Sequence, residues 1–332
     1  MAEDKVDDLV LLGALDPGEA AELLRAAPPG VGEADRKAGR LRFMVKTFAA
    51  AFLFLSSGSL PAAGCPEVQG LDPLLEPGAV LLVGEMHGTE QAPAFVRDVA
   101  CAASSKGLPI SVGLEVDRAE DEAFQAYLQS DGGTVARERL LAASFWQREF
   151  QDGRSSRAML GLMEDLRKLA AGAGELQVFL IDRPEPPAKR DAAMAERVAE
   201  SVAARPGDLL VVLTGNIHNR LTRGMPWNAE LEPMGYLLAK RLPKARIVSL
   251  DMAYPGGTAW VCFGSAPSDC RAQELGGSKA AADRSGVELL ENPAGEPYTG
   301  RYFTGPLTAS EPAIAPPSEA AVEPASAGAE GR

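Results

Sequence analysis

The stretch VLLVGEMHGT, residues 80–89, places a carboxylate and an imidazole two positions apart, directly behind a run of aliphatic side chains. The chain has only two histidines, and the second lies in VVLTGNIHNR, residues 211–220. The same order recurs there: an apolar run, a glycine, a polar residue, one spacer and a histidine. A short aliphatic run that ends in glycine and polar residues is typical of a buried strand. The repetition therefore predicts two buried strands that each deliver a histidine at their end.

Further aliphatic runs alternate with segments of helical spacing. Buried strands surrounded by helices indicate an α/β fold, with a mostly parallel central sheet, helices on both faces and a helical insertion between strands two and three. The expected strands are 79–85, 110–116, 177–183, 208–216 and 245–252, with an edge strand at 258–263. The expected helices are 93–104, 189–204 and 234–242, and the helical insertion runs from about 118 to 171.

Composition sets the limits of the main domain. A chain of 332 residues that is 46% hydrophobic can bury a full core, and we expect one α/β domain over residues 65–305. The segment 306–332 is rich in Pro, Ala, Ser and Glu, and is predicted to be a disordered tail. A net charge of −13 opposes binding to nucleic acid.

The N-terminal part has the pattern of an export signal. Residues 47–64 carry no charge, but only 48–55 is strongly apolar, which is short for a membrane span and suits a signal peptide at 44–64. Residues 1–43 would then be an extension that is not translated. The alternative is a membrane anchor at 44–64 with 1–43 in the cytoplasm. Both interpretations predict an exported protein, periplasmic or associated with the cell envelope, that meets the membrane only through this segment.

Cysteine usage agrees with export. The four cysteines form no CxxC pair, and their even number suits two disulfides. Cys262 and Cys270 bracket a short loop and would pair with each other, which leaves Cys65 to pair with Cys101. The alternative is that Cys65 is the lipidated first residue of a lipoprotein, in which case Cys101 has no partner.

Polar side chains gather where the predicted strands end. In open α/β sheets a ligand site lies beyond the carboxyl ends of the strands, where loops from different strands meet. If these strands are neighbours, their terminal side chains converge on one cleft. The residues concerned are Glu85, His87, Glu115, Asp182, Arg183, Asn216 and His218.

This set of side chains supports hydrolysis by either of two routes. Imidazole nitrogens and carboxylate oxygens can ligate a divalent metal that activates water. Without a metal, a histidine held by a carboxylate can act as general base, while Asn216 or Arg183 stabilises the oxyanion. The sequence has no GxSxG motif, which argues against a serine hydrolase. The residues predicted for either role are His87, His218, Glu85 and Glu115.

Further residues are candidates for substrate binding. The segment FWQREFQDGRSSRAM, residues 145–159, carries Arg154 near an aromatic pair, and a guanidinium group there would recognise substrate. The alternative for this segment is an ordinary helix surface. Arg220 would hold either an anionic group or one of the site carboxylates. The predicted substrate-binding residues are Asn216, Asp182, Arg183, Arg154 and Arg220.

GEMHG, GLE and GNIHN, in this order and at strand ends, resemble the motifs of the haem-binding uptake, Tiki and ChaN-like superfamily, to which erythromycin esterases and TraB-like proteins are related. The resemblance covers residues 77–264. It implies an α/β core whose active site contains Glu85, His87, Glu115, Asn216 and His218. Members differ in chemistry: Tiki-like proteins are metal-dependent proteases, erythromycin esterases use a histidine base without metal, and ChaN-like proteins bind haem.

Two functions from different classes follow. The first is an exported hydrolase of ester, amide or peptide bonds that acts on a small molecule or a peptide. The second is a haem- or metal-binding protein without turnover, in which haem would be ligated by His87, His218, Tyr254 or a methionine. The substrate, the metal and the oligomeric state stay open.

Overall fold

The computed structural model describes residues 64–314, apart from 173–174, 184 and 265. The predicted extension at 1–43 and all but the last residue of the predicted signal or anchor at 44–64 lie outside these residues. Within the described part of the chain, no helix is long and apolar enough to cross a membrane.

A seven-stranded sheet forms the centre of the fold, in the order β3-β2-β4-β1-β5-β9-β8. All neighbouring strands pair in parallel except β8, which pairs antiparallel with β9. The predicted α/β fold with a mostly parallel sheet is therefore confirmed. The strands are β1 Val80–Glu85, β2 Ile110–Asp117, β3 Leu176–Asp182, β4 Leu209–Gly215, β5 Ile247–Ala253, β8 Gly286–Leu289 and β9 Gly300–Phe303.

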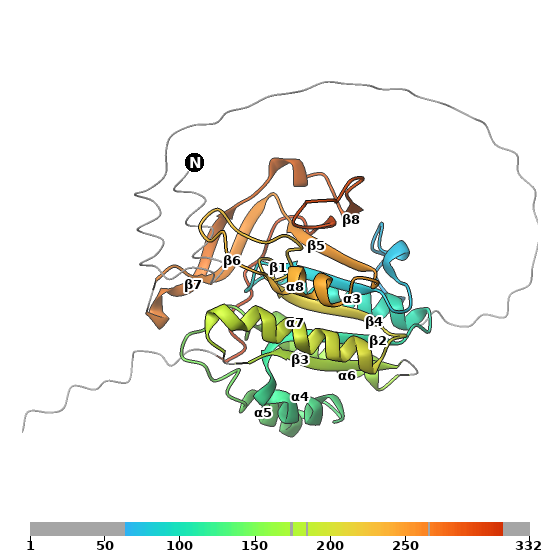
Figure 1. Ribbon diagram of the computed structural model, residues 1–332. Coiled ribbons are helices and arrows are strands. Elements are labelled where there is room, and N and C mark those ends of the chain that lie inside the picture. The colour runs from blue at the N-terminus through green and yellow to red at the C-terminus, as the bar shows by residue number, and fades with distance from the viewer. Residues whose placement is uncertain (1–63, 173–174, 184, 265, 315–332) are drawn as a thin grey trace, which may run out of the picture.

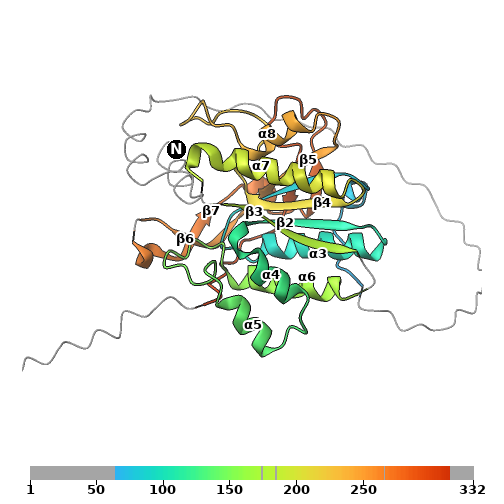
Figure 2. The same cartoon turned by 60° about the horizontal axis from the view of Figure 1, so that its bottom comes forward.

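Helices cover both faces of the sheet (Figures 1 and 2). On one face lie α3 (Gln91–Ser105) and α6 (Arg157–Ala170), and on the other lie α7 (Pro187–Ala204) and α8 (Met234–Arg241). Each face has its own hydrophobic cluster. Because both faces are covered, β1 and β4 are buried along their whole length, which explains their uninterrupted aliphatic sequence.

The predicted insertion between β2 and β3 is helical. It contains α4 (Asp121–Leu128) and α5 (Thr134–Leu141), which pack outside α6, and it ends with α6 itself. The side chain of Ser156 caps α6 by accepting a hydrogen bond from the backbone N–H of Met159. The short 3-10 helices are η1 Asp72–Leu74, η2 Arg118–Glu120, η3 Pro267–Asp269 and η4 Lys279–Ala281.

The predicted edge strand at 258–263 is not part of the main sheet. This segment is β6 (Gly256–Cys262), which pairs antiparallel with β7 (Cys270–Gly276) in a separate hairpin. The hairpin is attached to the main body by its backbone, because the N–H of Trp260 donates to the carbonyl of Gly88. The φ of Gly88 is +69°, and a Cβ there would lie 2.1 Å from the carbonyl oxygen of Trp260, so only glycine fits this position.

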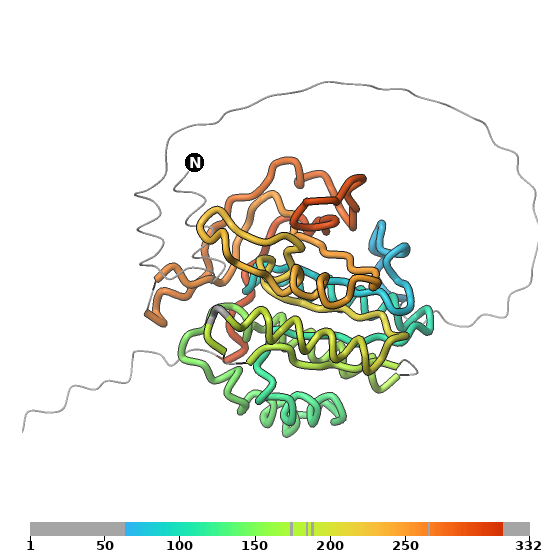
Figure 3. The backbone as a smooth tube through the Cα atoms, in the orientation of Figure 1, coloured from blue at the N-terminus to red at the C-terminus, as the bar shows by residue number. Residues whose placement is uncertain are grey.

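The described part of the predicted disordered tail packs against the domain. The side chains of Leu307 and Ser310 are buried, and the N–H of Ser310 donates to the carbonyl of Gly88. In Figure 3 the last described residues, in red, lie beside the loop between α5 and α6, to which the N–H of Ala313 donates at Ser155. The prediction of disorder is therefore wrong for residues 306–314. The prediction was based on composition, which does not reveal backbone hydrogen bonds to the domain. The rest of the predicted tail lies outside the described residues.

Both predicted disulfides are present. Cys65 is bonded to Cys101 in α3, and Cys262 is bonded to Cys270 across the β6–β7 hairpin. Lipidation of Cys65 would need the sulfur that forms the first of these bonds, so the structure favours the disulfide.

Candidate active site

The predicted polar side chains meet at the carboxyl ends of four adjacent strands. Glu85 ends β1 and is followed by His87, Glu115 is near the end of β2, Asp182 ends β3, and His218 follows β4. Because β3, β2, β4 and β1 are consecutive in the sheet, these four ends lie side by side. The predicted geometry is therefore present.

The first imidazole is held by a carboxylate. His87 Nδ1 lies 2.8 Å from Oε1 of Glu85, and His87 Nε2 lies 3.8 Å from Oε2 of Glu115. A Cβ at Gly215 would lie 3.0 Å from His87 Nε2, so the glycine at the end of β4 leaves room for the ring. Burial alone would lower the pKa of His87, but Glu85 and Glu115 together outweigh it and hold this pKa above its ordinary value.

The second imidazole has a matching arrangement. His218 Nδ1 lies 2.8 Å from Oδ1 of Asp191, which also accepts the backbone N–H of Met234 at the start of α8. Burial would lower the pKa of His218, yet Asp191 and Glu115 together raise it. Nη1 of Arg190 lies 3.0 Å from His218 Nε2. Since a guanidinium group only donates, this hydrogen bond forms when Nε2 carries no proton.

Glu115 lies between the two imidazoles and anchors two arginines. Its Oε1 accepts from Nη2 of Arg190 at 2.6 Å and from Nη1 of Arg154 at 3.3 Å, and its Oε2 accepts the N–H of Gly215 at 2.8 Å. Burial would raise the pKa of Glu115, but Arg190, the two histidines and Arg154 hold it well below its usual range. Glu115 is therefore ionised and is a weak base.

Arg154 reaches the site from the loop between α5 and α6. Its guanidinium donates to Oδ2 of Asp152 at 2.6 Å and lies 3.6 Å from Oδ2 of Asp182. The loop is held in place by the hairpin, because Nε1 of Trp260 donates to the carbonyl of Gln151. The predicted alternative, an ordinary helix surface, does not describe this segment, since Arg154 is part of the charged cluster.

The structure does not bring every predicted residue to the histidines. Arg183 is exposed and pairs with Glu185, so its predicted role at the oxyanion is wrong. Asn216 turns toward β5, where its Nδ2 donates to Oδ1 of Asp251 at 3.3 Å. Arg220 holds none of the site carboxylates among the described residues. Its Nη2 donates to Oγ1 of Thr222 at 3.5 Å, and its guanidinium group also interacts with the hydroxyl of Tyr298.

Two residues of the cluster were not predicted from the sequence. Arg190 and Asp191 lie near the start of α7, and Arg190 also donates to both carboxylate oxygens of Asp182. A signal was present, because KRD follows two prolines directly after the third strand, where a helix N-terminus faces the carboxyl edge of the sheet. Asp182 belongs to the site, but as a partner of these arginines.

The residues of the site do not fit a divalent metal. Among the described residues, no three of His, Cys, Asp and Glu are placed to hold one. Nδ1 of each histidine faces its own carboxylate, and Nε2 of His218 faces a guanidinium group, which repels a cation. The predicted ligands His87, His218, Glu85 and Glu115 are therefore close together without forming a metal site. Axial haem ligation needs an apolar pocket, and these imidazoles face charged groups instead.

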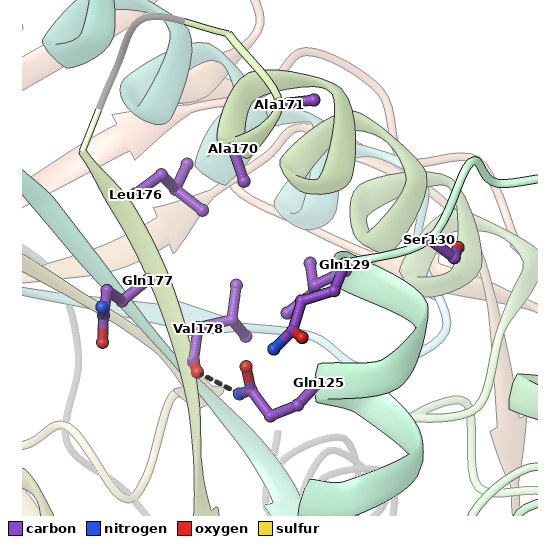
Figure 4. Close-up of a pocket in the computed structure, with 9 residues that line it drawn as sticks. Gln125, Gln129, Ser130, Ala170, Ala171, Leu176, Gln177 and Val178 are labelled. Carbon is purple, nitrogen blue, oxygen red and sulfur yellow. Dashed lines mark hydrogen bonds between the residues drawn. The ribbon is translucent and has the colours of Figure 1, made fainter.

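A cavity of about 420 Å³ lies elsewhere, between the ends of α4 and α6 and the start of β3 (Figure 4). Gln125 lines this cavity, and its side-chain amide donates to the carbonyl of Val178. Leu176 begins β3 and Asp182 ends it, so this cavity is at the opposite end of the strand from the histidines. Its lining contains glutamine, serine and aliphatic side chains, and none of them titrates near neutral pH.

Comparison with known proteins gives matches only in structure. No family model and no curated protein matches the sequence. A Bacillus cereus protein has a TM-score of 0.52 at 11% identity, over 74% of this chain and 93% of that one. A mutant of erythromycin esterase EreC in its open conformation has a TM-score of 0.52 at 13% identity, over 73% of this chain and 89% of that one.

The structure of haem bound to ChaN of Campylobacter jejuni also matches, with a TM-score of 0.33 at 11% identity, over 62% of this chain and 89% of that one. A score this low carries no argument about function. The two matches with a TM-score of 0.52 show a shared fold, and one of them is the erythromycin esterase EreC. The resemblance predicted from GEMHG, GLE and GNIHN is thus confirmed at the level of the fold.

Proposed function

We propose that this chain, which shares the fold of an esterase, is a hydrolase of ester, amide or peptide bonds that uses His87 as general base and needs no metal. The observation that carries this proposal is the environment of His87. Its Nδ1 is held by Glu85, while its Nε2 lies too far from Glu115 for a hydrogen bond. The lone pair on Nε2 is therefore available to take a proton from water.

His87 is a better base than the other candidates in the site. Nε2 of His218 receives a hydrogen bond from Arg190, so its lone pair is occupied. The low pKa of Glu115 makes this carboxylate a poor proton acceptor. The raised pKa of His87 makes its neutral form a stronger base than free imidazole.

The reaction begins when Nε2 of His87 removes a proton from a water molecule, whose oxygen attacks the acyl carbon. The carbonyl electrons move to the oxygen and form a tetrahedral oxyanion. When the electrons return, the bond to the leaving alcohol or amine breaks, and the imidazolium of His87 returns its proton to that group. One water is consumed and one acid is released, with His87 restored.

Arg154 and Arg190 provide the positive charge that this oxyanion requires. Both guanidinium groups are partly buried and point to the same carboxylate, Glu115, beside the imidazoles. Preorganised donors of this kind stabilise developing negative charge strongly. Glu115, Asp182 and the pair His218–Asp191 are positioning residues that hold the arginines.

Independence from metal can be tested directly. The purified protein is treated with EDTA and dialysed, and its metal content is measured. Its rate of hydrolysis of 4-nitrophenyl acetate is then compared with that of untreated protein. We expect hydrolysis to continue at the untreated rate. Loss of activity on chelation, with recovery on adding zinc or manganese, would contradict the proposed mechanism.

The two disulfides also support the proposed export, because such bonds persist in oxidising compartments. The predicted signal lies almost wholly outside the described residues. Fractionation of the host cell tests this part of the proposal, and recovery of the mature chain from the cytoplasm with reduced cysteines would contradict it.

A further inference from the structure

Arg220 is a cation without an acidic partner. Among the described residues it forms no ion pair within 4.0 Å, although it is partly buried. Its guanidinium carbon lies 5.7 Å from the centre of the Tyr298 ring, and its Nε is buried with no hydrogen-bond acceptor. A buried donor that is left unpaired is costly, so a ligand that supplies an acceptor would be stabilised here.

This arginine is connected to the proposed active site through Asn216. The hydroxyl of Tyr298 donates to the carbonyl of Asn216 at 2.7 Å, and the N–H of Asn216 donates to the carbonyl of Glu85 at 3.1 Å. The unpaired donor of Arg220 therefore belongs to a group of hydrogen-bonded residues that continues to Glu85, the partner of His87.

We infer that Arg220, held against the Tyr298 ring, binds a carboxylate group of the substrate near the proposed active site. The inference rests on the proposed function, because it assigns the substrate class: an ester or amide that carries a carboxylate near the bond to be cleaved. A carboxylate matches the planar guanidinium fork. A single arginine balances one negative charge, which suits a carboxylate better than a phosphate dianion.

The neighbouring acid Asp251 forms no ion pair with Arg220 within 4.0 Å and pairs with Asn216 instead. Asp251 accepts from Asn216, and burial raises the pKa of this carboxyl group above its ordinary value, although Asn216 and the arginines Arg301 and Arg220 oppose the shift. Burial thus disfavours the charged form of Asp251 relative to a carboxyl group in water. Arg301 is exposed and acts on Asp251 only through its charge, so it offers a matched control.

The test compares two esters that differ by one charge, 4-acetoxybenzoate and methyl 4-acetoxybenzoate. We expect the ratio of kcat/KM for the charged over the neutral ester to fall at least about tenfold in Arg220→Gln, the loss of one hydrogen bond to a charged group. Arg301→Gln should leave the ratio unchanged. An unchanged ratio in Arg220→Gln would overturn the inference. If Arg220→Gln does not fold, the same ratio is measured in Arg220→Lys. This variant keeps the positive charge but lacks the planar guanidinium group, so the ratio should again fall.

A binding measurement separates this inference from the proposed function. Titration calorimetry of 4-acetoxybenzoate is performed on His87→Ala, with and without Arg220→Gln. We expect His87→Ala to bind the probe, and the double variant to bind it at least about tenfold more weakly. If the wild type hydrolyses neither ester and the binding still depends on Arg220, the proposed function is refuted and the subsite is supported. Equal binding by the two variants would refute the subsite.

Discussion

The Nε2 atom of His87 lies 3.8 Å from Oε2 of Glu115, too far for a hydrogen bond and close enough for a strong charge interaction. The carboxylate therefore raises the basicity of the imidazole without occupying its lone pair. Glu115 can hold this position because the N–H of Gly215 and the side chain of Arg190 fix its two oxygens. This relationship leads to specific expectations for activity and stability.

The pH dependence should report the raised pKa of His87. Only the neutral imidazole can accept a proton, so kcat/KM should rise as the pH increases through a pKa above the ordinary value of 6.5. In Glu85→Gln the negative charge is lost, and the rise should move to lower pH with a lower plateau. Glu90→Gln removes the same charge from an exposed position and should leave the profile in place. A Glu85→Gln profile that coincides with the wild type would contradict this assignment.

The two arginines at positions 183 and 190 should behave differently. Arg190 contacts Glu115 and His218, whereas Arg183 is exposed and contacts Glu185. Arg190→Gln should reduce kcat/KM by roughly 10²–10³-fold, as expected for the loss of an oxyanion donor. Arg183→Gln should not reduce it. Steady-state kinetics on both variants checks this, and equal losses would show that Arg190 has no special role.

Removal of Glu115 should destabilise the protein. Glu115→Gln leaves Arg190 and Arg154 without their shared countercharge in a buried cluster, which should cost about 3–5 kcal/mol of unfolding free energy. Glu288→Gln breaks an ion pair with Arg284 in which both side chains are exposed, and should cost less than about 1 kcal/mol. Denaturant unfolding measures both.

The wild type and Glu115→Gln also show in which direction pH changes the stability of the fold. The pKa of Glu115 is lowered in the folded protein, so its stabilising contribution is fully present above the ordinary carboxylate pKa and is lost as the pH falls through the lowered value. The difference in stability between wild type and Glu115→Gln should therefore shrink in acid. A difference that grows on acidification would contradict the observed contacts.

The disulfides should stabilise the fold to different extents. Cys65–Cys101 joins residues 36 positions apart, and Cys262–Cys270 joins residues 8 positions apart. The loop-entropy model gives about 4 kcal/mol for the first and about 2.5 kcal/mol for the second. The double variant Cys65→Ser with Cys101→Ser should thus unfold at lower denaturant concentration than Cys262→Ser with Cys270→Ser. The reverse order would show that strain or residual structure outweighs loop closure.

The sequence predicted the strands best where both faces are buried. β1 and β4 have uninterrupted aliphatic runs, and the histidines that follow them lie together in the charged cluster. β8 and β9 were missed because each has only four residues and carries exposed polar side chains. Such short strands are fixed by pairing across the sheet, which local pattern does not record.

The charged cluster was predicted only in part for a related reason. Glu85 and Glu115 occupy strand ends, whereas Arg190 and Asp191 belong to a helix and reach the site through tertiary contacts. A helix with many charges normally has a solvent-exposed face, so the place of KRD at the start of the helix was the local signal for these two residues. Arg183 was chosen instead because it follows a strand directly, and its side chain turns outward.

Comparison of His87→Ala with His218→Ala tests the central claim most directly. Both variants are assayed with 4-nitrophenyl acetate, and their folding is checked by thermal unfolding. We expect His87→Ala to lose roughly 10²–10⁴-fold in kcat/KM, the usual contribution of a general base. His218→Ala should lose less, because His218 only orients Arg190. Hydrolysis that is unchanged in His87→Ala, or that depends more on His218 than on His87, would contradict the account.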